Sequence, residues 1–392
     1  MMLPLSGITV VSVEQAVAAP FATRQLADLG ARVIKIERPD GGDFARGYDT
    51  VVKGQSSYFV WLNRSKQSLT LDLKRSEGMG VLSQLLSKAD VFVQNLAPGS
   101  AVRLGVDNAA LCKKHPRLVA CTISGYGIDG PFADKKAYDL LVQAETGLVS
   151  ITGTAEAACK VGISVADIAA GMYAYSGILA ALFARATSGH GTSIDVSLFD
   201  ALGEWMGAPM YHAAYGRALQ RTGASHASIA PYGPFRTRDR EEIVIAIQNV
   251  REWRRFSVDV LEQPVLADDE RFATNAARVH NRNALQIAVE SVVGTLPTRD
   301  LIARLDQSRI AYGRVNDVRG FIDHPQLAER ECWREVPSPG GDVRALLPPV
   351  RMQRVAPVMG AVPALGEHTD AILNELGIDR DTIAVWRRES VV

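Results

Sequence analysis

Residues 8–37, which read ITVVSVEQAVAAPFATRQLADLGARVIKIE, contain the pattern that decides the fold. ITVVSV at 8–13 and ARVIKIE at 31–37 are short apolar runs, which favour buried strands. Between them, PFATRQLADLG at 20–30 has a proline in its first turn and a glycine at its end, as short helices often do. A strand, a helix and a strand in this order predict a βαβ unit with parallel strands.

The same alternation continues up to about residue 124. We expect further strands at 68–73, 90–95 and 117–124, with helices opening at Ser76 and lying near 107–114. Together these patterns predict a parallel, doubly wound sheet in an α/β fold. Such sheets bind ligands outside the carboxyl ends of their strands, so the chemistry is expected there.

The rest of the chain is expected to hold a second, smaller α/β domain. A strand and a helix at 192–206 complete a large first domain of residues 1–206. Residues 207–235 are rich in Gly, Ala, Pro and His and are predicted to be a linker. Alternating patterns return over 236–324, the predicted small α/β domain, and a Pro-rich strip and two helices occupy 325–392.

Composition excludes several classes of protein. The chain has 392 residues, 43 basic and 43 acidic side chains, and 47% apolar residues, which is ordinary for a soluble globular protein. At about 150 residues per domain, the length suggests two or three domains. A formal net charge of zero provides no basic field for nucleic acid or anionic membranes, so we expect neither as a partner.

The cysteines and the chain start favour a cytoplasmic protein. Four scattered cysteines form no CxxC pair and have no histidine at zinc-ligand spacing, so no metal site is expected. The amino-terminal residues lack the basic and apolar regions of a secretory signal. The apolar stretch 161–184 is long enough to span a membrane, but its Gly, Ser and Tyr content and Asp167 favour a buried helix.

Asp167 is the most informative acid, because it opens this apolar helix. An unpaired buried carboxylate is costly, so either its charge serves a reaction or a partner neutralises it. The alternative interpretation is a helix N-cap, and the two are compatible because a helix amino terminus keeps a carboxylate ionised. For a second acid, Asp139 in KKAYDLLVQAETG, a cap is the favoured interpretation.

Basic residues near the strand ends suggest an anion site, although each alone is more often a surface charge. As a set they could converge on phosphates at one sheet edge. They are Arg38, Lys74, Arg103 and Lys136. The first strand–helix turn has no GxGxxG, so Glu37 is only weak evidence for a dinucleotide ribose. No Walker lysine or GxSxG elbow is present.

Taken together, these blocks resemble the family III coenzyme A transferases, which include formyl-CoA transferase, the carnitine CoA-transferases and the α-methylacyl-CoA racemases. The resemblance runs nearly end to end and in order. Its blocks are LSGITVVSVEQAVAAPFATRQLADLGARVIKIERPDGGDFARG, NRSKQSLTLDLK, ADVFVQNLAPG, AYDLLVQAETGLVSITG, VADIAAGMYAYSGILAAL and PALGEHTDAILNELG.

The resemblance implies an intertwined homodimer, in which each chain builds a large CoA-binding domain from both of its ends. Residues 325–392 would then return to the first domain. Asp167 would be the nucleophile that carries acyl and CoA intermediates. Acyl-CoA and a small carboxylic acid would be the substrates, with no permanently bound cofactor.

The same matching implies a set of CoA contacts spread over the first domain. These are Val17, Ala18, Arg38, Leu71, Asp72, Leu73, Lys74, Asn95, Leu96, Ala97, Arg103, Lys136, Ala137, Tyr138 and Asp139. Leu96 replaces the aromatic residue that often follows the asparagine, which argues against adenine stacking there. The small domain lacks the glycine run of formyl-CoA transferase, which argues against formyl or oxalyl substrates.

Two functional hypotheses from different classes remain. A transferase moves CoA between acids, whereas a racemase needs two acid/base groups, and this chain has Tyr138 where racemases have histidine. An inert CoA-binding protein is disfavoured because Asp167 is intact. The segments 229–237 and 248–256 most resemble members that use mesaconate, itaconate or citramalate with succinyl-CoA. Arg46 or Arg236 would then bind the distal carboxylate of the acid.

Overall fold

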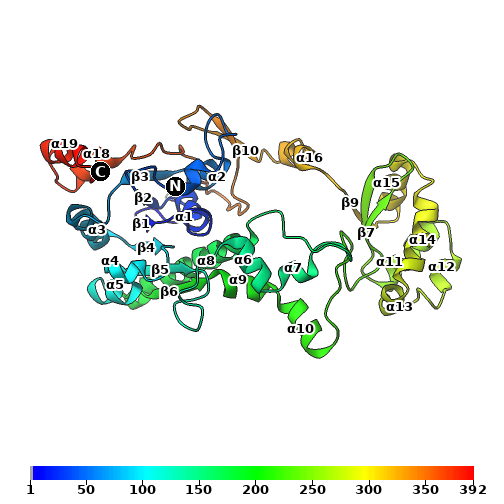
Figure 1. Cartoon of the computed structure of the whole chain (residues 1–392). Coiled ribbons are helices and arrows are strands. Elements are labelled where there is room, and N and C mark those ends of the chain that lie inside the picture. Colours follow the sequence, from blue (N-terminus) through cyan, green and yellow to red (C-terminus); the bar gives the residue numbers. More distant parts are fainter. Residues whose placement is uncertain (1–2) are drawn as a thin grey trace. The chain divides into compact units, whose positions relative to one another are not determined.

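The computed structural model describes residues 3–392, which form two compact units. The first unit contains the chain up to Thr146, together with Val161–Gly207 and Glu329–Val392. The second unit contains Gly147–Lys160 and Ala208–Ala328. Figure 1 shows the elements of both units along the chain.

A six-stranded sheet with the order β3-β2-β1-β4-β5-β6 forms the centre of the first unit. All neighbouring strands are parallel. The strands are β1 (Thr9–Val13), β2 (Arg32–Glu37), β3 (Lys66–Thr70), β4 (Val91–Gln94), β5 (Val119–Ser124) and β6 (Ser193–Ser197). The predicted parallel, doubly wound sheet is therefore confirmed, and the strand order reverses between β1 and β4.

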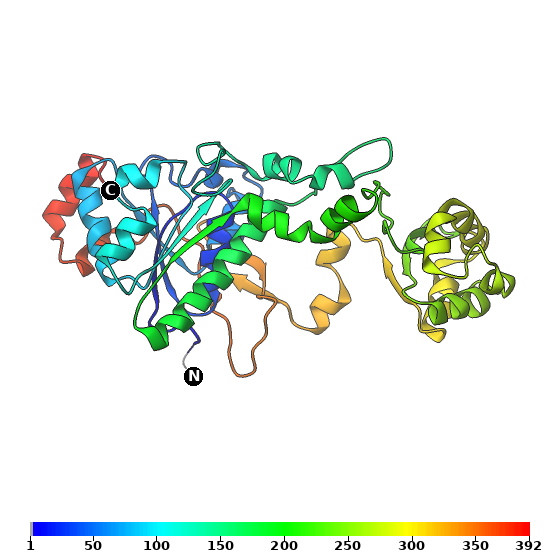
Figure 2. The same ribbon diagram turned by 90° about the horizontal axis from the view of Figure 1, so that it is seen from below.

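Helices lie on both faces of this sheet (Figure 2). Those of the first unit are α1 (Ala18–Asp28), α2 (Ser57–Asn63), α3 (Ser76–Lys88), α4 (Ser100–Leu104), α5 (Asn108–Lys114), α6 (Asp139–Glu145), α8 (Val165–Ser188), α9 (Leu198–Trp205), α18 (Thr369–Glu375) and α19 (Arg380–Arg388). A short 3₁₀ helix, η1 (Phe44–Gly47), and a hairpin of β10 (Trp333–Val336) and β11 (Val343–Leu346) complete the unit.

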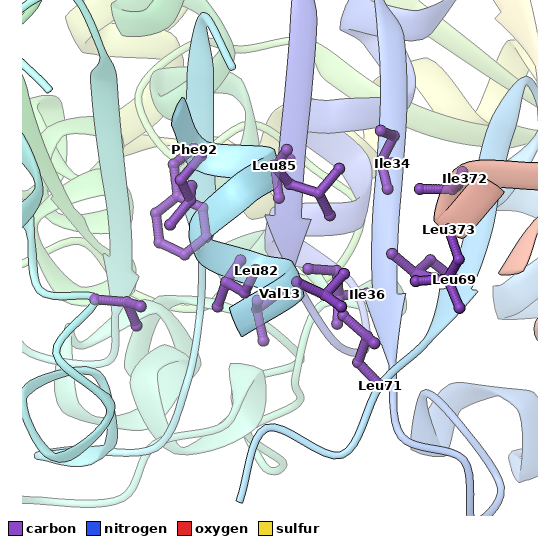
Figure 3. Packing of buried hydrophobic residues seen from close by; sticks show 14 of the residues in the cluster. Val13, Ile34, Ile36, Leu69, Leu71, Leu82, Leu85, Phe92, Ile372 and Leu373 are labelled. Atoms are coloured by element: carbon purple, nitrogen blue, oxygen red, sulfur yellow. The ribbon is translucent and has the colours of Figure 1, made fainter. Parts of the chain in front are cut away.

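One face of the sheet is apolar. Alternate residues of β1, β2 and β3, among them Val13, Ile34 and Leu69, point into a core with α3 and α18 (Figure 3). Leu85 comes from α3 and Leu373 from α18, so both ends of the chain contribute to the same core. Figure 2 shows the C-terminal helices, in red, beside α3. The segment predicted as 325–392 thus joins the first unit from Glu329 onward.

The opposite face of the same strands is polar although it is buried. Ser12 and Glu14 at β1, Lys35 on β2 and Lys66 on β3 are all at most 3% exposed. Because side chains alternate across a strand, these residues occupy the positions between those of the apolar core. Buried charges need partners, and on this face the buried lysines and carboxylates are partners of one another.

The predicted apolar helix is α8, which packs against α1, α9, β5 and β6. Within residues 3–392, it is the one helix whose length and composition would suffice to cross a membrane. Its residues that face the protein, such as Ala170 and Ala174, are buried, whereas Phe183 is 80% exposed. At Gly171 the helix comes so close to α1 that an added Cβ would lie 2.6 Å from the Ala18 carbonyl oxygen.

The second unit has a three-stranded sheet of order β7-β8-β9, which is antiparallel. The strands are β7 (Tyr232–Arg236), β8 (Glu242–Ala246) and β9 (Ala311–Arg314). The helices are α7 (Leu148–Ile151), α10 (Gly207–Tyr215), α11 (Val250–Arg255), the π-helix η2 (Phe256–Val260), α12 (Val265–Asp268), α13 (Asn275–His280), α14 (Arg282–Val293), α15 (Thr298–Gln307), α16 (Val318–Ile322) and α17 (Pro325–Glu329).

The predicted boundaries in the middle of the chain differ from this arrangement. The stretch 207–235, predicted as a linker, contains α10 and most of β7, because its Ala, Met and Tyr residues allow a helix. Only five residues join β7 to β8, which is enough for a hairpin and too few for a parallel crossover. Residues 147–160, predicted within the large domain, belong to the second unit.

The contact between α1 and α8 gives a direct test of packing. Gly171→Ala should destabilise the protein by about 1–3 kcal/mol, because its Cβ would collide with backbone. Gly177→Ala in the same helix is the matched control, since its Cβ would lie 3.5 Å from Ile194, an ordinary contact. Helix propensity alone predicts that both changes stabilise by about 0.5–1 kcal/mol. Equal shifts in denaturant midpoint for the two variants would contradict the close approach.

Candidate active site

A cleft of about 690 Å³ lies in the first unit, at the carboxyl ends of the first four strands. Gln15 follows β1, Arg38 follows β2, Lys74 follows β3 and Leu96 follows β4, and all four line the cleft. A doubly wound sheet binds ligands at this edge, where its strand order reverses.

Three of the four predicted phosphate-binding cations line this one cleft. Arg38 donates to the Gly42 carbonyl at 3.3 Å, Arg103 donates to the Ser100 hydroxyl at 2.7 Å, and Lys74 is exposed. The fourth, Lys136, is exposed outside the lining of the cleft. The cleft thus has a cationic wall suited to a ligand with several phosphate groups.

The structure brings together only part of the predicted CoA contacts. Leu71, Asp72, Leu73 and Leu96 line the cleft with the three cations. The other predicted contacts lie outside its lining: Val17, Ala18, Asn95, Ala97, Lys136, Ala137, Tyr138 and Asp139. The side chain of Asn95 bonds both the N–H and the carbonyl of Gln15, so it shapes the loop at the cleft.

Asp139, and not Asp167, is the carboxylate that caps the apolar helix. It is the first residue of α6, yet its Oδ1 accepts the N–H groups of Ala166 at 2.7 Å and of Asp167 at 3.4 Å, in the first turn of α8. Its Oδ2 accepts from Gln143. The N-cap position of α8 belongs to Ser164. The cap interpretation therefore holds for Asp139 on a neighbouring helix, and it does not hold for Asp167.

Asp167 is a carboxylate in an unfavourable environment. Burial and the negative charge of Asp139 raise the pKa of Asp167 to about 7. Among the described residues, no side chain forms a hydrogen bond or ion pair with it. Tyr48, at the end of η1, is close enough that Asp43 and Asp167 add to the effect of burial and raise the tyrosine pKa to about 12. A carboxylate that titrates near neutrality and keeps free lone pairs is suited to act as a nucleophile.

The predicted carboxylate-binding role does not fit Arg46. Its guanidinium donates to both oxygens of Glu37 at 2.8 Å and lies 3.7 Å from the Phe59 ring centroid. Burial alone would raise the pKa of Glu37, but the hydrogen bonds of Arg46 and the charge of Lys35 hold it at about 2. The pairing also excludes Glu37 as a ribose ligand. Arg236, on β7 of the second unit, is exposed and 3.5 Å from Glu242.

Sequence reasoning missed a buried ionic network behind the cleft. Lys66 Nζ lies 2.7 Å from Glu14, Lys35 Nζ lies 2.6 Å from Asp43, and Lys35 also lies 3.7 Å from Glu14. The available signal was Lys35 within VIKIE, a charged residue between two isoleucines of a predicted buried strand. No group of three metal-ligating side chains is found in the described part of the chain.

These features define an α/β protein with a cationic cleft at the carboxyl edge of its sheet and a carboxylate of raised pKa in α8. Residues 5–369 match the sequence profile of CoA-transferase family III. A succinate–glutarate CoA-transferase from Agrobacterium fabrum is 33% identical over 384 residues, covering 95% of this chain and 96% of the relative. A succinyl-CoA–D-citramalate CoA-transferase from Chloroflexus aurantiacus is 30% identical over 403 residues, covering 99% and 98%.

A solved structure agrees with this assignment. The crystal structure of a CaiB/BaiF family protein from Brucella suis has a TM-score of 0.83 and 34% identity, and the alignment covers 96% of this chain and 100% of the other. The chain therefore belongs to CoA-transferase family III, as the sequence blocks indicated, and is an enzyme of the CoA-transferase class.

The pKa of Asp167 predicts a pH profile. For Asp167 as the attacking group, only the ionised carboxylate reacts, so kcat/KM for an acyl-CoA should rise with pH through an apparent pKa of about 7 and then level off. Asp139→Asn keeps an oxygen for the Ala166 N–H and removes the repelling charge, so the rise should move to lower pH. Glu145→Gln, an exposed acid of the same helix α6, is the control and should not shift it. Coincident profiles for Asp139→Asn and the wild type would contradict the assignment.

Proposed function

We propose that this enzyme transfers CoA from an acyl-CoA, with succinyl-CoA as the donor, to a C4 or C5 dicarboxylate. The observation that carries the proposal is Asp167, a carboxylate with a raised pKa that forms no ion pair with a side chain in the described part of the chain. The cationic cleft and the family membership support the CoA part of the substrate.

The proposed reaction consists of four exchanges at Asp167. A carboxylate oxygen attacks the thioester carbonyl, the C–S bond breaks, and CoA thiolate and a mixed anhydride form. The thiolate attacks Cγ of Asp167 and releases the donor acid, which leaves an aspartyl-CoA thioester. The acceptor carboxylate then attacks Cγ and expels the thiolate. Finally the thiolate attacks the acceptor acyl carbonyl and frees Asp167, so no net proton transfer is needed.

The environment of Asp167 suits this sequence of steps. A carboxylate with a higher pKa is a stronger nucleophile once it is ionised, and a pKa near 7 leaves a large fraction ionised at neutral pH. Removal from water also protects an anhydride from hydrolysis. Asp139 has two roles in this environment. Its charge raises the pKa of Asp167, and its hydrogen bonds hold the first turn of α8.

The choice of a dicarboxylate rests on the relatives. Two of them are named for glutarate and for citramalate, each with succinate or succinyl-CoA as the other substrate. Itaconate, mesaconate and citramalate are our candidate acceptors. Because Arg46 is paired to Glu37, we no longer propose it as the partner of the distal carboxylate, and the predicted role of Arg236, which lies 3.5 Å from Glu242 in the second unit, stays a prediction. An acyl-CoA racemase is the second candidate, and it is disfavoured because this chain has Tyr138 in place of the histidine that supplies one of the two acid/base groups in racemases.

We also propose an intertwined homodimer located in the cytoplasm. An uncovered apolar side of α8, with Tyr173 and Phe183 exposed, supports a second copy as its cover. All four cysteines are free thiols, the state that a reducing compartment maintains.

The first test is an exchange assay. Wild-type enzyme incubated with succinyl-CoA and single acids should form the thioesters of C4 and C5 dicarboxylates, measured by mass spectrometry, and more slowly those of oxalate or monocarboxylates. Asp167→Ala should lower turnover by orders of magnitude and leave CoA binding intact, because the nucleophile is lost and the cations remain. A variant that kept a tenth of the activity would exclude Asp167 as the nucleophile. Solvent proton exchange at the α-carbon without an acceptor acid would favour the racemase.

The second test concerns the cationic wall. Arg38→Ala, Lys74→Ala and Arg103→Ala should each weaken acyl-CoA binding by about 1–3 kcal/mol, or about 5- to 150-fold in Kd, because each removes a charge-assisted contact. Lys113→Ala, an exposed lysine outside the lining, is the control and should bind as the wild type does. Calorimetric titration with CoA measures the Kd of each variant. Unchanged affinity in all three variants would show that these residues are surface charges without a role in CoA binding.

A further inference from the structure

The loop after β1 has an unusual backbone that two side chains hold in place. Ala16 has a φ of +61°, a left-handed conformation that residues other than glycine rarely adopt. The preceding Gln15 is bonded through its N–H at 2.9 Å and its carbonyl at 2.8 Å to the side chain of Asn95. The Ala16 N–H donates to Asp43 Oδ1 at 3.0 Å. Such conformations persist where the surroundings over-determine them, often at functional sites.

Asp43 is itself held from every side. It is 1% exposed, and its Oδ1 also accepts the Ala45 N–H, which caps η1. Its Oδ2 accepts from Lys35 Nζ at 2.6 Å, and its own N–H donates to Glu37. One buried carboxylate therefore joins the loop after β1 to the start of η1.

The loop lies between the cleft and the helix that carries the nucleophile. Gln15 lines the cleft, and two residues after Ala16 the chain enters α1. The first residue of α1, Ala18, makes the close approach to Gly171 of α8. Gly171 is one turn beyond Asp167, so both are on the same face of α8. A shift of the loop would change the position of the cleft relative to the carboxylate.

We infer that Asp43 is a positioning residue, which sets the place of the bound thioester relative to Asp167 by accepting the Ala16 N–H. This inference rests on the proposed function of Asp167. Misplacement of reacting groups by about 1 Å can cost on the order of 100-fold in rate, so the hydrogen bond should affect chemistry more than CoA affinity.

Two double variants separate positioning from stability. Removing Lys35 and Asp43 together avoids an unpaired buried charge, and replacement of such a pair by apolar residues is often tolerated. Lys35→Met with Asp43→Asn keeps an oxygen acceptor for the Ala16 N–H, whereas Lys35→Met with Asp43→Leu has a side chain of similar size and no acceptor. The asparagine variant keeps an acceptor for the N–H groups of Ala16 and Ala45, and the leucine variant removes it for both.

The measurement is the single-turnover rate of enzyme-bound CoA thioester formation at saturating succinyl-CoA, followed by mass spectrometry of the intact protein. We expect the asparagine variant within about threefold of the wild type and the leucine variant at least tenfold slower, with equal Kd for CoA in both. Equal rates in the two variants would overturn the positioning role. Absence of the adduct in the wild type would instead overturn the proposed function.

A single variant at another position provides the test if the leucine variant does not fold. Asn95→Ala removes the other hold on the same loop without unpairing a buried charge. We expect a loss of at least tenfold in the same rate, in a variant that circular dichroism shows to be folded at the assay temperature. A wild-type rate in Asn95→Ala would overturn the inference.

Discussion

The buried ion pairs on one face of the central sheet constrain everything built on it. Lys35 and Lys66 are withdrawn from water among parallel strands, so each needs a carboxylate within direct reach. Asp43 and Glu14 provide these partners. The opposite face of the same strands carries the apolar core, so a slip of one residue, which exchanges the two faces, would place charged side chains in that core.

The carboxylates of the candidate site differ in whether they have a cationic partner. Around the cleft, buried acids have partners, as Glu37 has in Arg46. Asp167 is the exception, since no cationic side chain of residues 3–392 pairs with it, and Asp139 repels it while accepting N–H groups of the first turn of α8. Carboxylates with perturbed pKa values cluster at functional sites, which is the basis for proposing Asp167 as the nucleophile.

Much of the first unit could be predicted from the sequence, and the limits have physical causes. Apolar runs predict its strands, and proline and glycine at the ends of a segment predict its helices. Asp167 is also recognisable from the sequence, as a lone acid in an apolar helix. The antiparallel second sheet was not, because alternating patterns do not report strand direction. The true partners of Arg46 and Asp139 were also hidden, since a salt bridge to Glu37 and a cap on another helix depend on tertiary contacts. The sequence places Lys35 in a buried strand, but only the three-dimensional structure shows that Asp43 balances its charge.

Covalent attachment of CoA to Asp167 can be tested directly by trapping the activated carboxyl group. Cleavage after Lys160 and Arg185 releases the peptide VGISVADIAAGMYAYSGILAALFAR, in which Asp167 is the single carboxylate side chain. Enzyme incubated with succinyl-CoA and quenched with hydroxylamine should yield this peptide as a hydroxamate at Asp167, because hydroxylamine traps an activated acyl group. A hydroxamate on any other peptide, or none under conditions of full turnover, would show that Asp167 does not carry the activated acyl group.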